Sequence, residues 1–171
     1  MITFEIKLLG NDESFRLKEI KAQTLLQKVW NSEEFKQAIL NKTHIETQGR
    51  LWWKKEVDVK GFTSTNDTNE QVYACLMSTD HLVIQQQEDD CPDPSTVGYE
   101  QDGDPVTYVC KAFTEEMDEY DVANNAAHEL CHSLGYHHSS ATDYDSVPYF
   151  CGNLVEQLAK QADGVSTPNN I

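Results

Sequence analysis

The chain has 171 residues, 39% hydrophobic and 25% charged, a composition that predicts one globular domain with a single core and excludes a disordered segment. Its 29 acidic and 13 basic residues give a net charge of −16, so phosphate backbones would be repelled and no nucleic acid partner is expected. No apolar run approaches the roughly 20 residues that cross a bilayer, so membrane insertion is not expected either.

The first half of the chain predicts alternating strands and helices. Residues 2–9 alternate apolar and polar side chains, as in a half-buried strand. Apolar residues at three- and four-residue steps predict helices over 17–40, with a new segment starting at Ser32. Residues 51–59 predict a second strand, and the polar stretch 61–69 predicts a loop.

The middle of the chain continues this alternation. Thr68 is positioned to cap a short helix, and residues 81–85 predict a strand. The Asp, Pro and Gly content of 88–105 predicts an irregular surface excursion with a short edge strand near Thr96 to Tyr99. Residues 106–113 predict another strand.

The last third predicts a helix capped by Asp118 or Asp121, and residues 163–171 predict a frayed tail. Repeats and linkers are absent from the sequence, so residues 1–162 are expected to form one domain of mixed α/β (α+β) architecture. Trp30, Trp52 and Trp53 are interpreted as core or interface aromatics.

Four of the six histidines lie between residues 128 and 138. Helical spacing places His128 and His132 together, opposite an apolar stripe, so both imidazoles can reach one metal ion. Gly135 ends the helix and lets His138 turn back as a third ligand. Three histidines leave a fourth position for water, and Glu129 is placed to act as the general base that activates this zinc-bound water. The pattern therefore indicates a catalytic Zn²⁺ site.

This run, His-Glu-x-x-His-x-x-Gly-x-x-His, resembles the signature of the metzincin zinc metallopeptidases, and residues 128–139 look most like the matrixin version. The resemblance covers about a dozen residues. It implies a zincin fold with a twisted mixed sheet backed by two helices, an active-site helix and a small C-terminal subdomain. It also implies that His128, His132 and His138 bind zinc, that Glu129 is the catalytic base, and that the protein is secreted or extracellular.

The sequence departs from the family where a methionine turn is expected, because all three methionines precede the motif. Val147 or Pro148 is a candidate for the apolar floor in its place. Tyr149 resembles the tyrosine that follows this turn in some members, which makes it a candidate to bind the metal or stabilise the oxyanion. The alternative is a core aromatic that packs near Phe150.

Other residues bear on the cellular compartment of the protein and on a second metal ion, and they decide neither question. Five cysteines permit two disulfides, of which Cys91 with Cys110 and Cys131 with Cys151 are the first pairs to consider. The pairs Asp102 with Asp104 and Asp143 with Asp145 make Ca²⁺ an alternative ligand, although neither forms a recognisable calcium loop. The segment that begins at Met1 lacks the features of a signal peptide.

These observations predict a monomeric zinc endopeptidase that acts on protein or peptide substrates bound beside an edge strand. The short stretch between His138 and Tyr149 predicts a shallow pocket and loose selectivity. Three alternatives remain: a zinc-binding interaction protein that has lost catalysis, a zinc hydrolase acting on a non-protein amide or cell-wall peptide, and a metal-free binding module.

Overall fold

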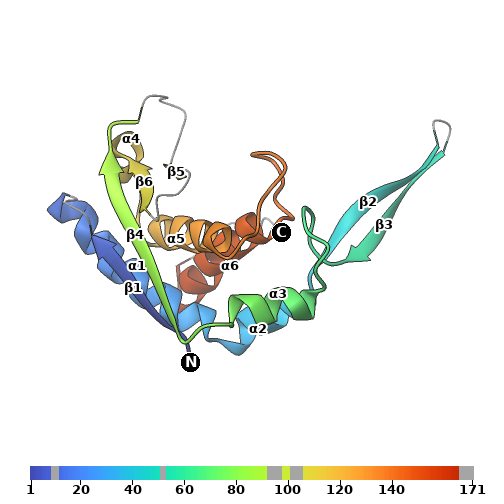
Figure 1. Cartoon of the computed structure of the whole chain (residues 1–171), viewed down its shortest axis with the longest axis horizontal. Coiled ribbons are helices and arrows are strands. Elements are labelled where there is room, and N and C mark those ends of the chain that lie inside the picture. Colours follow the sequence, from blue (N-terminus) through green and yellow to red (C-terminus); the bar gives the residue numbers. More distant parts are fainter. Residues whose placement is uncertain (9–11, 51–52, 92–97, 101–105, 166–171) are drawn as a thin grey trace.

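A four-stranded sheet forms one layer of the protein, as the computed structural model shows (Figure 1). The structure describes residues 1–8, 12–50, 53–91, 98–100 and 106–165. The strand order is β1-β4-β6-β5, with bounds Thr3–Leu8, His81–Asp89, Val106–Cys110 and Gly98–Glu100. The first three strands are parallel and β5 is antiparallel at the edge. The mixed α/β prediction is therefore confirmed at this level.

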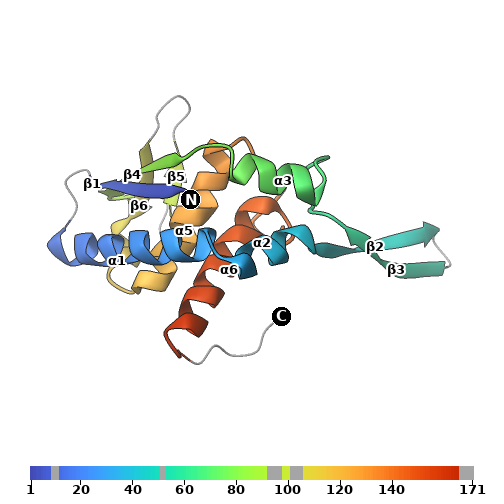
Figure 2. The ribbon, with the colours of Figure 1, turned by 90° about the horizontal axis from the view of Figure 1, so that it is seen from below.

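Helices cover one face of the sheet (Figure 2). Leu82 and Ile84 of β4 are buried, whereas Val83 between them is 40% exposed, so only one face faces the core. Helix α1 (Glu13–Trp30) lies against β1, and α5 (Glu119–Ser133) and α6 (Val147–Ala162) pack on each other. Since α1 contacts β1, α5 and α6, it connects the sheet with the helix pair.

Trp30, at the end of α1, joins several elements. Its ring stacks on Phe35 of α2 (Glu33–Leu40) at 4.7 Å and meets Phe4 of β1 edge-on at 5.7 Å. Its indole N–H donates to the carbonyl of Leu76, at the end of α3 (Asn69–Leu76). Ser32 and Thr68 cap α2 and α3, so both predicted helix starts are confirmed.

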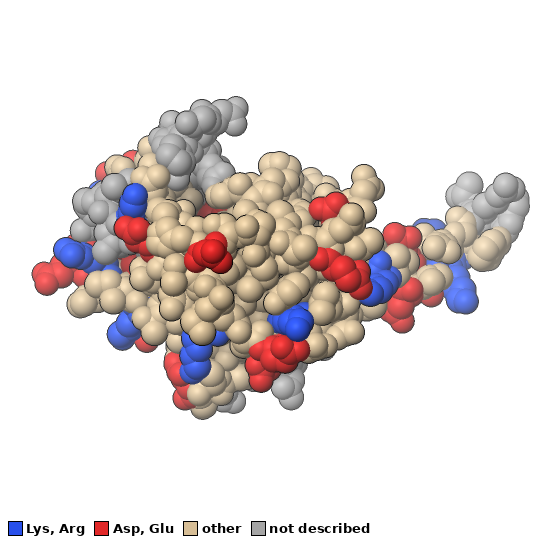
Figure 3. Space-filling view, turned by 60° about the horizontal axis from the view of Figure 1, so that its bottom comes forward, with Lys and Arg blue, Asp and Glu red and all other residues tan. Residues whose placement is uncertain are grey.

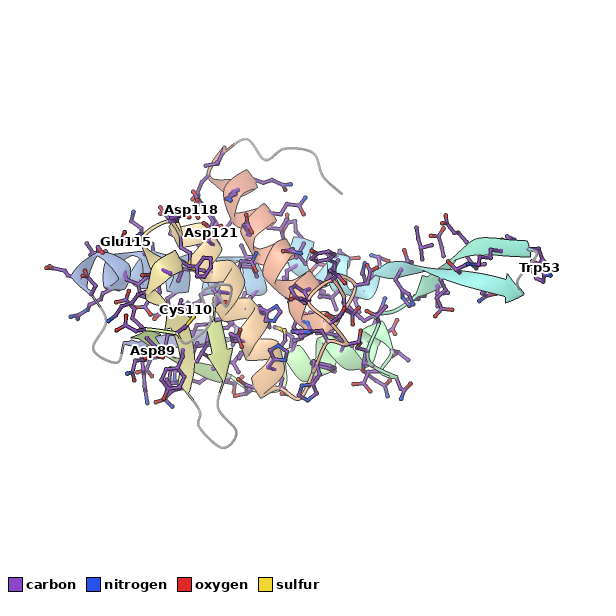
Figure 4. The ribbon with its side chains drawn as sticks, turned by 90° about the horizontal axis from the view of Figure 1, so that it is seen from above. Trp53, Asp89, Cys110, Glu115, Asp118 and Asp121 are labelled. Carbon is purple, nitrogen blue, oxygen red and sulfur yellow. A yellow bond between two sulfur atoms is a disulfide. The ribbon has the colours of Figure 1, made fainter. Side chains whose placement is uncertain are left out.

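A two-stranded hairpin projects from the body and packs on no other sheet in the described chain (Figures 1 and 2). It pairs β2 (Thr43–Arg50) with β3 (Trp53–Lys60), so the strand predicted over 51–59 exists but its partner was not predicted. Trp53 lies at the far end of the hairpin (Figure 4) and is 57% exposed, so its interpretation as a core aromatic is wrong. Trp52 lies outside the described residues. Gly49 has φ +133°, and a Cβ there would collide with the carbonyl oxygen of Trp53.

One predicted disulfide is confirmed and the other is wrong. Cys91 and Cys110 are bonded, with Cα atoms 5.3 Å apart. Cys131 and Cys151 are free thiols, fully buried between α5 and α6 and in hydrogen-bond contact. They fill the core as small apolar side chains.

The strand predicted over 106–113 is shorter than expected, because α4 (Lys111–Thr114) follows directly after Cys110. Of the predicted edge strand near Thr96 to Tyr99, the described part is β5. Helix α6 ends at Ala162, and most of the predicted tail lies outside the described residues.

Acidic and basic side chains are interleaved over the face seen in Figure 3. Among the helices that the structure describes, none combines the length and apolar character that a bilayer span requires.

A close contact between α5 and α6 gives a stability prediction. A Cβ at Gly152 would lie 2.9 Å from the carbonyl oxygen of Asn124 and would also collide with its side chain. Gly152→Ala should therefore lower the free energy of unfolding by about 1–3 kcal/mol, measured by urea denaturation. The exposed α6 variant Gln161→Ala should stay within about 0.5 kcal/mol of the wild type, and equal stability of both variants would contradict this packing.

Candidate metal centre

Helix α5 begins with a capping box and has one buried stripe. Asp118 accepts hydrogen bonds from the backbone N–H groups of Tyr120 and Asp121, both at 2.9 Å, and the Asp121 carboxylate accepts from the Asp118 N–H. Val122 and Leu130 are among the residues that face the core, as their spacing predicts. This fixes the rotation of α5, so that the histidine side faces away from the core.

The same helix ends in a glycine turn. Gly135 has φ +92°, its N–H donates to the carbonyl of His132, and the N–H of Tyr136 donates to the carbonyl of Cys131. This pair of bonds is a Schellman motif, in which the residue with positive φ is usually glycine. The predicted helix stop is confirmed, and the chain reverses direction within three residues of His138.

The reversal brings three imidazoles together. Ring centroids lie 4.8 Å apart for His128 and His132, 5.3 Å for His128 and His138, and 5.0 Å for His132 and His138. Each offers one ring nitrogen, and these atoms all lie within 4.8 Å of one another. Among the described residues this is the one group of three or more His, Cys, Asp or Glu side chains that converges on a shared point.

Hydrogen bonding orients the imidazoles as a metal site requires. His132 Nδ1 donates to the carbonyl of Tyr136 at 2.8 Å, which leaves its Nε2 with a free lone pair. That Nε2 lies 3.1 Å from the Nε2 of His128. Nitrogen ligands about 2.0–2.1 Å from a tetrahedral zinc ion would be about 3.4 Å apart, so this pair fits one ion after a small adjustment.

Burial also favours neutral ligands. Desolvation, together with the nearby His132 and His138, lowers the pKa of His128 to about 3. Desolvation likewise lowers the pKa of His132, although its hydrogen bond to the Tyr136 carbonyl acts in the opposite direction. Since only the neutral ring offers a lone pair to a metal, both groups are ready to bind at neutral pH.

Glu129 and Tyr149 lie beside this cluster. Glu129 follows His128 on α5 and is 9% exposed. The Tyr149 ring, in the first turn of α6, lies 4.6 Å from the His128 ring and 4.7 Å from the His138 ring. Burial, then the charges of Tyr144 and Glu129, raise the pKa of Tyr149, so its phenol stays protonated. Phe150 packs on Phe62 instead, at 5.4 Å, so Tyr149 faces the imidazoles and not that aromatic pair.

Three other residues near the cluster, which the sequence also singled out, lie outside the group of converging imidazoles. His137 is exposed and stacks on His132 at 5.8 Å, outside the group that converges. Val147 and Pro148, the candidates for an apolar floor, are both buried in the first turn of α6, directly before Tyr149.

Asp143 ties the loop after His138 to the loop before α3. It accepts from the backbone N–H and hydroxyl of Ser139, both at 3.0 Å, and from the hydroxyls of Thr63 and Ser64. Burial would raise the pKa of Asp143, but these hydrogen bonds outweigh it and hold the pKa below its usual range. Asp145 pairs with Lys42 at 2.5 Å. Both carboxylates are therefore engaged by protein donors, and neither belongs to a converging group of three or more ligand side chains among the described residues, so Ca²⁺ at this pair stays a prediction.

The second predicted calcium pair, Asp102 with Asp104, lies outside the described residues. The hydrogen bonds by which Asp143 connects the two loops were not predicted from the sequence, in which its carboxylate was the only signal.

Comparison of the chain with protein-family models, with curated proteins and with solved structures finds no match.

The cluster predicts one zinc equivalent that depends on His138. His138→Ala should weaken zinc binding by more than about 100-fold, measured by competition with a chromophoric chelator, because two imidazoles then remain. The neighbouring His137→Ala should bind within about threefold of the wild type. Equal losses in both variants would contradict the assignment of the third position.

The lowered His128 pKa predicts how the stability of the protein, kept metal-free by a chelator, depends on pH. The unfolded chain takes up a proton near the ordinary pKa of 6.5, whereas the folded protein resists protonation until about 3. The free energy of unfolding should therefore fall as the pH decreases from about 6.5 towards 4, by at most about 1.4 kcal/mol per pH unit. Urea denaturation of the wild type and His128→Gln, both with chelator, measures this contribution. Parallel pH profiles would contradict it.

Proposed function

We propose that the protein is a zinc-dependent endopeptidase. The observation that supports this best is the convergence of three imidazoles with a carboxylate, Glu129, that follows one of them on the same helix. A structural zinc site is usually closed by four protein ligands, whereas three protein ligands are typical of a catalytic site with an open position. Cys131, the nearest thiol in sequence, is buried on the core side of α5.

In this proposal His128, His132 and His138 hold the metal. When bound, zinc lowers the pKa of a coordinated water towards 7 and polarises a carbonyl group. The His132 hydrogen bond to the Tyr136 carbonyl keeps one ligand nitrogen directed at the centre, and Asp143 holds the backbone N–H of Ser139, the residue after His138.

Glu129 and Tyr149 have separate roles. Glu129 takes a proton from the attacking water and delivers it to the amine that leaves, as a general base and then a general acid. Tyr149 keeps its phenol proton because its pKa is raised, and its ring contacts two of the three imidazoles. It is thus placed to donate a hydrogen bond to the developing oxyanion of the substrate.

The sheet edge is suited to a peptide. β5 pairs only with β6 in the described chain, which leaves its outer backbone groups available to an extended substrate strand. A substrate bound in this way needs no particular sequence, because its main chain provides the hydrogen bonds.

We further propose a metzincin-like arrangement. The three parallel strands with an antiparallel edge strand correspond to the mixed sheet, α1 and α5 to its two helices, and α6 to the smaller C-terminal part. The glycine turn at Gly135 supports the same assignment.

Glu129→Ala tests the role of the base. The variant should keep its zinc, because no ligand is removed, yet cleave denatured casein about 10²–10⁴-fold more slowly. Gel-based cleavage assays and metal analysis measure the two properties on one sample. Glu119→Ala, at the other end of α5, is the matched control and should retain full activity. Zinc-loaded wild type that hydrolyses no peptide or protein would refute the proposed function, and unchanged turnover in Glu129→Ala would refute the base.

A further inference from the structure

A pocket of about 610 Å³ lies beside the metal centre and shares no residue with it. It opens between the base of the hairpin and the loop that leads into α3. Its walls include His44 and Glu46 of β2, Val59 and Lys60 of β3, Asp67 of the loop, and Asn69 at the start of α3. The pocket is therefore formed by a part of the chain that is far in sequence from the histidine motif.

Two carboxylates and a buried amide oxygen line this pocket. Asp67 and Glu46 present exposed carboxylates. Asn69 is 1% exposed, and its Nδ2 donates to two backbone carbonyls, but its Oδ1 has no hydrogen-bond partner. Gly61 also lines the pocket, and a Cβ built there would lie 4.0 Å from this oxygen. A buried acceptor without a donor is costly, so the site is suited to a ligand rich in N–H groups.

The charge in the pocket favours a cation. Lys60 is the one Lys or Arg side chain among its described lining residues, and it is paired with Glu70 at 2.9 Å. Glu46, whose carboxylate lies 3.2 Å from His44 Nε2, and Asp67 therefore leave an excess of negative charge when His44 is neutral. These carboxylates do not belong to any group that converges on one point, as the three imidazoles do, so an extended organic cation suits them better than a metal ion.

Two hydrogen bonds connect the pocket with the metal centre. The Tyr136 hydroxyl donates to Asp67 at 3.2 Å, and the Tyr136 carbonyl accepts from His132 Nδ1 at 2.8 Å. The loop before α3 also runs beside the loop after His138 (Figure 1), where the N–H of Thr63 donates to the carbonyl of Asp145. The two sites are thus joined through a single tyrosine, a separation that an extended peptide, at about 3.3 Å per residue, spans within a few residues.

We propose that this pocket binds a lysine or arginine side chain of the peptide substrate, a few residues from the bond that is cut. The inference rests on the proposed endopeptidase function and adds a selectivity for basic residues. Asp67 is the specificity-determining residue, because its carboxylate meets the cation while its bond to Tyr136 fixes its position.

Paired peptides test this selectivity. Quenched fluorescent decapeptides of alanine and leucine carry one lysine, moved through each position, and each has a partner with norleucine in place of lysine. At the best position the wild type should cleave the lysine peptide with a kcat/KM about tenfold above that of its partner. Raising the salt concentration from about 0.05 to about 0.5 M should reduce this ratio, because salt shortens the Debye length and screens the attraction between lysine and the carboxylates.

Asp67→Asn should bring the ratio below about threefold, because the amide still accepts from Tyr136 but carries no charge. Asp58→Asn is the control: it removes one charge from an exposed hairpin residue outside the pocket and should keep the tenfold ratio. Thermal melting and zinc content of both variants should match the wild type. Equal cleavage of lysine and norleucine peptides at every position would overturn the inference and leave the endopeptidase function intact.

Binding separates the two proposals if no peptide is cut. Fluorescence anisotropy with zinc-loaded Glu129→Ala protein measures the affinity for the same peptides. Tighter binding of lysine peptides, lost in Glu129→Ala combined with Asp67→Asn, would support the pocket even if the endopeptidase function failed. Equal affinity for both members of every pair would overturn it.

Discussion

For His138 to join the other two imidazoles, α5 has to stop directly after His132 and the backbone has to turn back. Gly135 makes this turn at φ +92°, where a side chain would add strain, and the Schellman hydrogen bonds fix it. The same turn places the Tyr136 carbonyl at His132 Nδ1, so one backbone feature both delivers the third imidazole and orients the second. The capping box at Asp118 completes this arrangement, because it fixes where the helix begins and which side faces the core.

The loop beyond His138 depends on a distant part of the chain. Asp143 collects hydrogen bonds from Ser139 on one side and from Thr63 and Ser64 on the other, and Ser64 itself has φ +59°. Lys42, just before β2, adds its ion pair with Asp145. These ties place the base of the hairpin against the centre. The hairpin has little core of its own, so this junction is the part of it that the rest of the fold stabilises.

Local patterns predicted the elements whose residues determine them locally. The alternation around Phe4, the caps at Ser32, Thr68 and Asp118, and the histidine spacing across Gly135 all appear as predicted. The features that were not predicted depend on contacts between residues distant in sequence. The polar strand β2 carries almost no apolar alternation, Cys131 and Cys151 pack as thiols between helices, and the pocket combines β2, β3 and the loop to α3. The shallow pocket expected from the segment between His138 and Tyr149 stays a prediction; the pocket walled by residues 44–70 is a separate feature that this segment does not form.

The net charge of −16 and the proposed selectivity act over different ranges. An acidic surface draws basic peptides and metal cations towards the protein, which raises the rate of encounter. At physiological salt, however, exposed charges are screened beyond about 8 Å, so the overall field treats all cationic peptides alike. Selection of one lysine at one position requires a carboxylate within hydrogen-bond distance. In the proposal Asp67, held by Tyr136 next to the three imidazoles, provides this carboxylate, whereas most of the other acidic residues contribute only to attraction.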